Sequence, residues 1–135
     1  MRAVALLLLL ASSTQSVAAD VVFRCSNIKG TMLAAPSWTV NADGFGQKEV
    51  LLGYRDASQG EVRWSDGLAY SGLGVAMNGG FAIIALGEEF IETFVVNVGS
   101  GDLLMTAVRT SSGLLPNSSK AFRGTCQPAG NEVRR

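Results

Sequence analysis

Histidine is absent from this 135-residue chain, and charged residues make up only 16% of it. Without histidine, no Ser-His-Asp or Cys-His arrangement and no histidine-bound metal site can form. Basic and acidic residues number 11 each, so there is no excess of positive charge to bind nucleic acid. A chain with 47% apolar residues and no net charge collapses instead of staying disordered. We therefore expect a folded, non-enzymatic domain with no catalytic residues, no metal, no cofactor and no nucleic-acid partner.

Long hydrophobic runs are also lacking. The run from Ala3 to Ala11 has 9 residues, whereas a membrane-spanning helix needs about 20. Arg2 precedes this run, and a polar stretch and then small residues at 17–19 follow it, which is the pattern of a secretory signal peptide. We predict a signal peptide over residues 1–19, cleaved before Asp20. The mature protein is then expected to be periplasmic or secreted and not to span a membrane.

Removal of residues 1–19 leaves 116 residues with 10 basic and 11 acidic side chains, a net charge of −1. No repeat and no linker interrupts the rest of the sequence. We predict a single β-domain over residues 20–130, followed by a flexible tail at 131–135.

Cysteine occurs only twice, at Cys25 and Cys126. An oxidising compartment makes a disulfide the expected state, and closing a loop of about 100 residues could stabilise the fold by up to roughly 4.7 kcal/mol. Metal ligation and a reactive thiol pair are the alternatives, but there is no Cys-x-x-Cys spacing. Period-two alternation places Phe23 with Cys25, and Phe122 with Cys126, on apolar strand faces. The first and last strands are therefore predicted to be neighbours, either side by side or across a sandwich.

Helical patterns are nearly absent after the leader, whereas short apolar alternations punctuated by glycine turns are frequent. This pattern predicts an all-β fold: a small, meander-rich antiparallel barrel or a two-sheet sandwich, with one disulfide joining the terminal strands. The predicted strands span about 20–26, 34–42, 48–54, 61–65, 68–76, 81–86, 89–97, 102–109 and 120–126.

Asp66-Gly67 predicts a tight hairpin between two of these strands. With a two-residue turn, Trp64 pairs with Ala69 and Arg63 pairs with Tyr70, so a cation–π contact between Arg63 and Tyr70 is expected. The core face of this hairpin would then consist of Val62, Trp64, Ala69, Ser71, Leu73 and Val75.

The segment 81–86 is apolar on both of its faces. A turn at Asn78-Gly79 places Phe81 opposite Ala76, so that one face continues the glycines of the preceding strand. Such a strand is either central and covered on both faces or part of a subunit interface.

Two groups of residues are candidates for function. Glu88, Glu89 and Glu92 form the densest acidic cluster, and the ordinary interpretation is a solvated connection that protects an apolar strand from edge pairing. An enzyme that uses these carboxylates alone is the catalytic alternative. The predicted ligand- or partner-binding residues are Tyr54, Arg55, Arg63 and Tyr70.

The signal peptide, Phe23-Arg24-Cys25, the turn segment 97–103 and the closing Phe-Arg-Gly-Thr-Cys at 122–126 resemble a loose group of small secreted proteobacterial proteins of unknown function. The resemblance implies a disulfide-stapled β-domain and supplies no catalytic residue. We expect a domain that binds a protein partner in the manner of an inhibitor or adaptor. The alternative is a carrier of a small apolar ligand in a barrel cavity. A cavity lined by Trp64, Leu73 and Ile84 would favour the carrier, and a packed interior with an exposed apolar patch would favour the partner.

Overall fold

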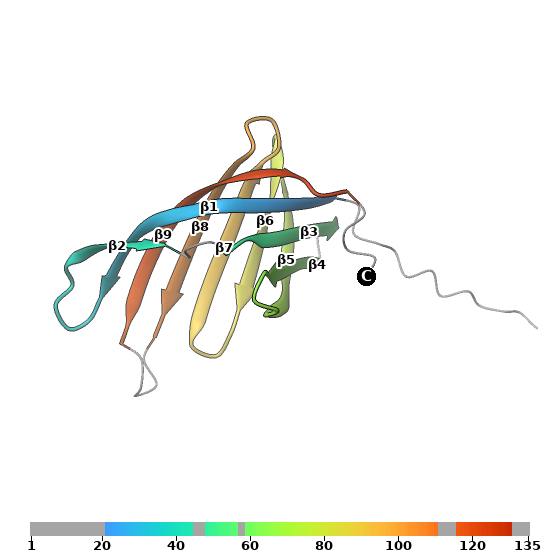
Figure 1. Cartoon of the computed structure of the whole chain (residues 1–135). Coiled ribbons are helices and arrows are strands. Elements are labelled where there is room, and N and C mark those ends of the chain that lie inside the picture. Colours follow the sequence, from blue (N-terminus) through green and yellow to red (C-terminus); the bar gives the residue numbers. More distant parts are fainter. Residues whose placement is uncertain (1–20, 45–47, 57–58, 111–115, 131–135) are drawn as a thin grey trace, which may run out of the picture.

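A computed structural model describes residues 21–44, 48–56, 59–110 and 116–130 (Figure 1). The predicted signal peptide at 1–19 and the predicted tail at 131–135 lie outside these described residues. Nine strands and no helix are present in the described part of the chain. The strands are β1 (Val21–Ala34), β2 (Val40–Gly44), β3 (Val50–Asp56), β4 (Gln59–Trp64), β5 (Ala69–Met77), β6 (Gly80–Leu86), β7 (Phe90–Asn97), β8 (Asp102–Arg109) and β9 (Ser118–Pro128).

The strands form a closed antiparallel barrel. Each strand from β3 to β8 pairs with the next one in sequence, and β1 pairs with both β3 and β9, which closes a ring of eight. The remaining strand, β2, is not part of this ring and pairs with the second half of β1. In Figure 1, β1 and β9 run side by side across the other strands, and β6, β7 and β8 form one continuous wall. The all-β, meander-rich prediction is confirmed, and the barrel is the correct choice between the two architectures.

The predicted disulfide is present between Cys25 and Cys126, which are directly paired residues of β1 and β9. The terminal strands are thus side by side, and the bridge fixes the seam at which the barrel closes. Cys25 is completely buried and packs with the core.

The first strand is longer than the sequence pattern predicts. β1 continues to Ala34 through the segment 26–30, which is polar except for the buried Ile28, and the predicted strand at 34–42 reduces to β2. A register shift between Ser26 and Lys29 accommodates the polar segment while pairing with β9 continues to Ala34. Pairing with a distant strand thus extends β1 where local alternation gives no signal.

The barrel interior is filled with apolar side chains. Phe81 lies between Phe23 and Tyr54, with ring centroids 5.9 and 5.4 Å away respectively. Trp64 packs against the fully buried Phe94. The other large buried members of the core are Ile28, Val50, Leu52, Val62, Ile83, Val96, Leu103, Met105 and Phe122.

The predicted pairing of β4 with β5 is wrong by one residue. Val62 pairs with Tyr70, and the backbone N–H of Trp64 donates to the carbonyl of Leu68 at 2.8 Å. The connection therefore has three residues, and Gly67 supplies a positive φ of 96° at its end. A slip of one residue exchanges the two faces of a strand. Tyr70 consequently faces the interior.

Because of this difference in register, the predicted core face and the predicted cation–π contact between Arg63 and Tyr70 are also wrong. Arg63 pairs with Ala69 on the outer side of the wall, on the opposite face from Tyr70. Leu73 and Val75 point outward and are 52% and 41% exposed. Of the predicted core face, Val62 and Trp64 are buried, whereas Ala69, Ser71, Leu73 and Val75 are exposed.

The predicted pairing of β5 with β6 is correct, because Ala76 lies opposite Phe81. Phe81, Ile83 and Ala85 point into the core and are almost fully buried. The other face ends in Leu86, which is 63% exposed, and no described element packs over it.

Candidate functional site

The most extensive hollow described lies at one open end of the barrel. Its cavity volume is about 380 Å³, and we call it the mouth pocket. The residues lining it come from strand ends and connections: Lys48, Trp64, Asp66, Leu68, Ala69, Tyr70, Phe90, Glu92 and Arg109.

Strand alternation directs the mouth-pocket side chains of β7 and β8 toward the inside of the barrel. On β7, Phe90 and Glu92 share a face with the buried Phe94 but lie closer to the strand end, where the core no longer covers them. On β8, Arg109 continues the inward face of Leu103 and Met105. Each strand therefore contributes apolar residues to the core and more polar ones to the mouth.

A hydrogen-bonded chain of three side chains forms one wall of the pocket. The indole N–H of Trp64 donates to the Tyr70 hydroxyl oxygen at 3.0 Å, and the Tyr70 hydroxyl donates to the carboxylate of Glu92. Burial raises the pKa of Tyr70 well above its usual range, and the bond to Glu92 raises it further. The hydroxyl thus stays protonated, and Glu92 is held in place.

Arg109 is the electrostatically unusual residue of the mouth. Its side chain is half-buried and has no hydrogen-bond or ion-pair partner among the described residues. A second hollow of about 130 Å³ adjoins the mouth pocket and shares Phe90, Glu92 and Arg109 with it. A half-buried guanidinium without a partner is costly, and a ligand carboxylate would supply two parallel hydrogen bonds.

The two lysines that line these hollows are already paired. Lys48 lies 3.0 Å from Asp66, and Lys120 lies 2.9 Å from Asp43. The backbone N–H of Leu68 and then the ammonium of Lys48 lower the pKa of Asp66. The cation that remains available to a ligand within the described mouth is therefore Arg109.

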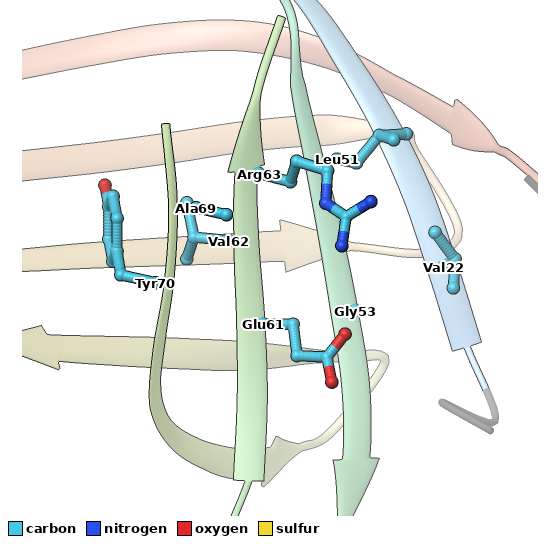
Figure 2. A pocket seen from close by; sticks show the side chains of 8 residues that line it. All are labelled: Val22, Leu51, Gly53, Glu61, Val62, Arg63, Ala69 and Tyr70. Atoms are coloured by element: carbon cyan, nitrogen blue, oxygen red, sulfur yellow. The ribbon is translucent and has the colours of Figure 1, made fainter. Parts of the chain in front are cut away.

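A smaller hollow than the mouth pocket, the outer groove, lies on the outside of the wall formed by β1, β3, β4 and β5 (Figure 2). Its volume is about 260 Å³. Figure 2 shows Arg63 and Glu61 over this outer surface, whereas Tyr70 points away from them. Arg55 lies 3.5 Å from Glu61, and Arg63 is exposed without a partner among the described residues.

The structure separates the four residues predicted to bind a ligand or partner. Tyr54 packs against the core and stacks on Phe81, whereas Tyr70 lines both the mouth pocket and, with Arg63, the outer groove. Arg55 and Arg63 are on the outer side, as their alternation with Tyr54 and Val62 requires. The four residues therefore do not converge on one site, and a binding role for each stays a prediction.

Sequence reasoning missed Phe90 and Arg109, and it placed Glu92 only in an acidic cluster. The cluster is divided in the structure, because Glu92 lines the mouth pocket while Glu88 is exposed in the connection before β7. One signal in the sequence could have identified Arg109 as a site residue. It is a charged residue at the end of an alternating apolar strand face that also contains Leu103 and Met105.

Two kinds of feature are absent from the described residues. No cluster of three or more potential metal ligands occurs there. No helix in that part of the chain is long and apolar enough to cross a membrane. Comparisons with known proteins were also negative: no family model, no curated protein and no solved structure matches the chain.

Proposed function

We propose that this protein is a non-enzymatic binding domain whose mouth pocket holds an apolar or aromatic group that carries a carboxylate, presented by a protein partner. The observation that carries the proposal is the half-buried Arg109, which has no partner among the described residues and lies in a hollow with three aromatic side chains.

The chemistry of the pocket defines the ligand class. Arginine pairs with carboxylates in a planar, bidentate geometry that other cations do not reproduce. Trp64, Tyr70 and Phe90 offer apolar and aromatic surface next to it. The C-terminal residue of a polypeptide, with an apolar side chain and a free carboxylate, satisfies both requirements at once, and so does a small free acid.

Several observations favour a partner over a carrier of apolar ligands. The interior of the barrel is filled by Phe94, Leu52, Ile83 and the other core residues. Leu73 and Ile84, expected to line a carrier cavity, belong instead to the outer surface. A purely apolar ligand in the mouth would also remove water from Glu92 and Arg109 without replacing its hydrogen bonds, which is unfavourable.

The same site offers little to a catalytic mechanism. Tyr70 has a raised pKa, so it is a poor base or nucleophile at neutral pH. The carboxylate of Glu92 accepts the hydrogen bond of Tyr70. These features support binding in preference to acid–base chemistry.

Tryptophan fluorescence can test the proposal directly. The chain has two tryptophans, so a Trp38→Phe background leaves Trp64, which lines the pocket, as the reporter. The probes are N-acetylphenylalanine, its C-terminal amide, and a short peptide ending in phenylalanine with either a free or an amidated C-terminus. We expect the two carboxylate probes to change the fluorescence and the two amides to bind far more weakly.

Arg109→Gln should weaken binding of the carboxylate probes by about 10- to 100-fold, because charge-assisted hydrogen bonds are lost. Arg63→Gln is the matched control, since it removes an unpaired cation from the outer groove and leaves the mouth intact. Binding that depends on Arg63 and not on Arg109, or no response to any carboxylate, would refute the proposal. Tighter binding of the peptide than of N-acetylphenylalanine identifies a polypeptide C-terminus, and equal binding identifies a small acid.

A further inference from the structure

The outer surface of β5, β6, β7 and β8 is apolar over an area that spans all four strands. Register places its side chains in rows that cross the sheet. One row contains Val75, Ala82, Val95 and Leu104, the next contains Leu73, Ile84, Thr93 and Thr106, and a third contains Leu86, Ile91 and Val108. We call these eleven residues the outer apolar face.

No member of the outer apolar face carries a charge. Charged side chains gather instead on the other outer walls, where Arg24 pairs with Glu49 and Arg55 pairs with Glu61. Asp102 and Arg123 form an ion pair at the β8–β9 edge of the face, so the uncharged area is bounded by charged side chains there. The core is complete without the outer face.

The polar side chains of the face, Thr93 and Thr106, satisfy part of their hydrogen bonding with each other. Thr93 and Thr106 are directly opposite each other, and one hydroxyl donates a hydrogen bond to the other. Burying this pair therefore leaves less unsatisfied hydrogen-bonding capacity than burying two isolated hydroxyls would. The backbone groups of β6 and β7 are paired with a neighbouring strand on both sides, whereas the second half of β5, from Leu73 to Met77, pairs with β6 alone.

The exposed area is suited to a modest interface. Leu73, Val75, Leu86, Ile91, Leu104 and Val108 are each 41–63% exposed. Together they present roughly 500 Å² of apolar surface, at the upper end of what monomers usually show. Half-buried Ile84, Val95 and Thr93 extend the footprint toward the about 800 Å² that each partner contributes to a standard interface.

We propose that the outer apolar face is the interface of a reversible homodimer, in which the four-stranded walls of two copies pack against each other. A two-fold interface brings one patch against itself, so any charged patch must also carry its own complement. An uncharged patch meets this requirement without further specialisation, and it offers no charge pattern with which to select a different protein. Sheet faces pack well in this way when their side chains are apolar.

The dimer leaves the mouth pocket open. The pocket is lined by residues of strand ends and connections at one end of the barrel, whereas the outer apolar face is built from outward-facing residues of the wall. The two sites can therefore be inactivated separately. The Arg109→Gln variant should dimerise like the wild type, which separates this inference from the proposed function.

Sedimentation velocity from about 1 μM to about 200 μM, a range that brackets a micromolar dissociation constant, tests the dimer. We expect the wild-type domain to move from monomer to dimer across this range. Leu104→Glu should remain monomeric at the highest concentration, because it places two like charges in the two-fold interface. Val40→Glu is the matched control, since Val40 is 67% exposed on β2, outside the face, and should dimerise normally.

Leu86→Gln provides a second variant if Leu104→Glu loses its strand circular-dichroism signal, because Leu86 is the most exposed member of the face. It should weaken the dimer at least 5-fold. A wild-type domain that stays monomeric throughout, including one that instead binds lipid vesicles or an unrelated protein through this face, would overturn the proposal. Equal effects of Leu104→Glu and Val40→Glu would do the same.

Discussion

Tyr70 is the residue that joins the core to the mouth. It accepts a hydrogen bond from the buried Trp64, donates one to Glu92 and contacts the ring of Phe90 edge-on at a centroid distance of 6.4 Å. One side chain therefore positions both the aromatic wall and the carboxylate of the pocket. Its role depends on the hydroxyl and not only on the ring.

Tyr70→Phe should lower the free energy of unfolding by about 1 kcal/mol at neutral pH, since the variant loses the hydrogen bonds of the hydroxyl. The folded state keeps this proton at pH values where the unfolded chain, with an ordinary tyrosine pKa of about 10, has lost it. Wild-type stability should therefore fall as the pH rises above about 10, and the deficit of the variant should shrink. Urea unfolding at pH 7 and at higher pH measures both effects; a deficit that does not change with pH would contradict the assignment.

Single residues were the least predictable part of the site. Arg109 and Glu92 occupy ordinary positions in their strands, and their proximity depends on the register of β7 with β8, where Glu92 pairs with Ala107. Nothing local distinguishes an arginine that points into the mouth from one that points to solvent. The cysteines were predictable because their number, separation and apolar neighbours restrict the possibilities strongly.

Between neighbouring strands, the turn chemistry decides which faces are apolar. The Asp66-Gly67 pair correctly predicted a hairpin, but the added Ser65 makes a three-residue connection and moves every side chain of β5 to the opposite face. For this reason a two-residue turn wrongly predicts that Leu73 and Val75 lie in the core. The same one-residue error in the β4–β5 register prevented prediction of the outer apolar face.

The pairing of β1 with β9 offers a test of strand packing. A Cβ atom on Gly30 would lie 1.9 Å from the carbonyl oxygen of Ala121, so alanine at this position would force the two backbones apart. We expect Gly30→Ala to lower the free energy of unfolding by at least about 2 kcal/mol. Gly99→Ala is the control, because its nearest neighbour, the Asn97 side-chain oxygen, would be 3.4 Å away.

Urea denaturation of the two glycine variants gives the comparison. If Gly30→Ala proved as stable as Gly99→Ala, the close approach of β1 and β9 at this point would be incorrect. The slope of unfolding free energy against urea concentration (the m-value) should be the same for both variants. An unchanged m-value would show that the difference in stability arises in the folded state.

For the barrel as a whole, the class was predictable and the closure was not. Short alternating strands with glycine turns specify an antiparallel all-β meander, and the apolar faces around Cys25 and Cys126 indicated that its ends meet. Barrel and sandwich share these signals. They differ in whether β1 finds β3 and β9 on its two edges, which is a long-range property.

The disulfide should contribute substantially to stability because it joins residues 101 positions apart at the seam. We expect the Cys25→Ala/Cys126→Ala double variant to lose about 3–5 kcal/mol of unfolding free energy relative to the oxidised protein. Wild-type protein unfolded in the presence of a reducing agent is the control and should match the double variant within about 1 kcal/mol. A loss below about 1 kcal/mol would mean that strand pairing alone closes the barrel.

The pairing of β1 with β9 also determines when the domain can fold. The seam is made by the first and last strands, so the strand that completes the ring is the last to be synthesised. A nascent chain that ends before residue 118 can form the successive hairpins from β3 to β8, but it leaves the core open along one edge. Contacts so distant in sequence also slow closure after synthesis. Closure of this barrel is therefore expected only after β9 has been synthesised, with hairpins forming early and ring closure and thiol oxidation following together.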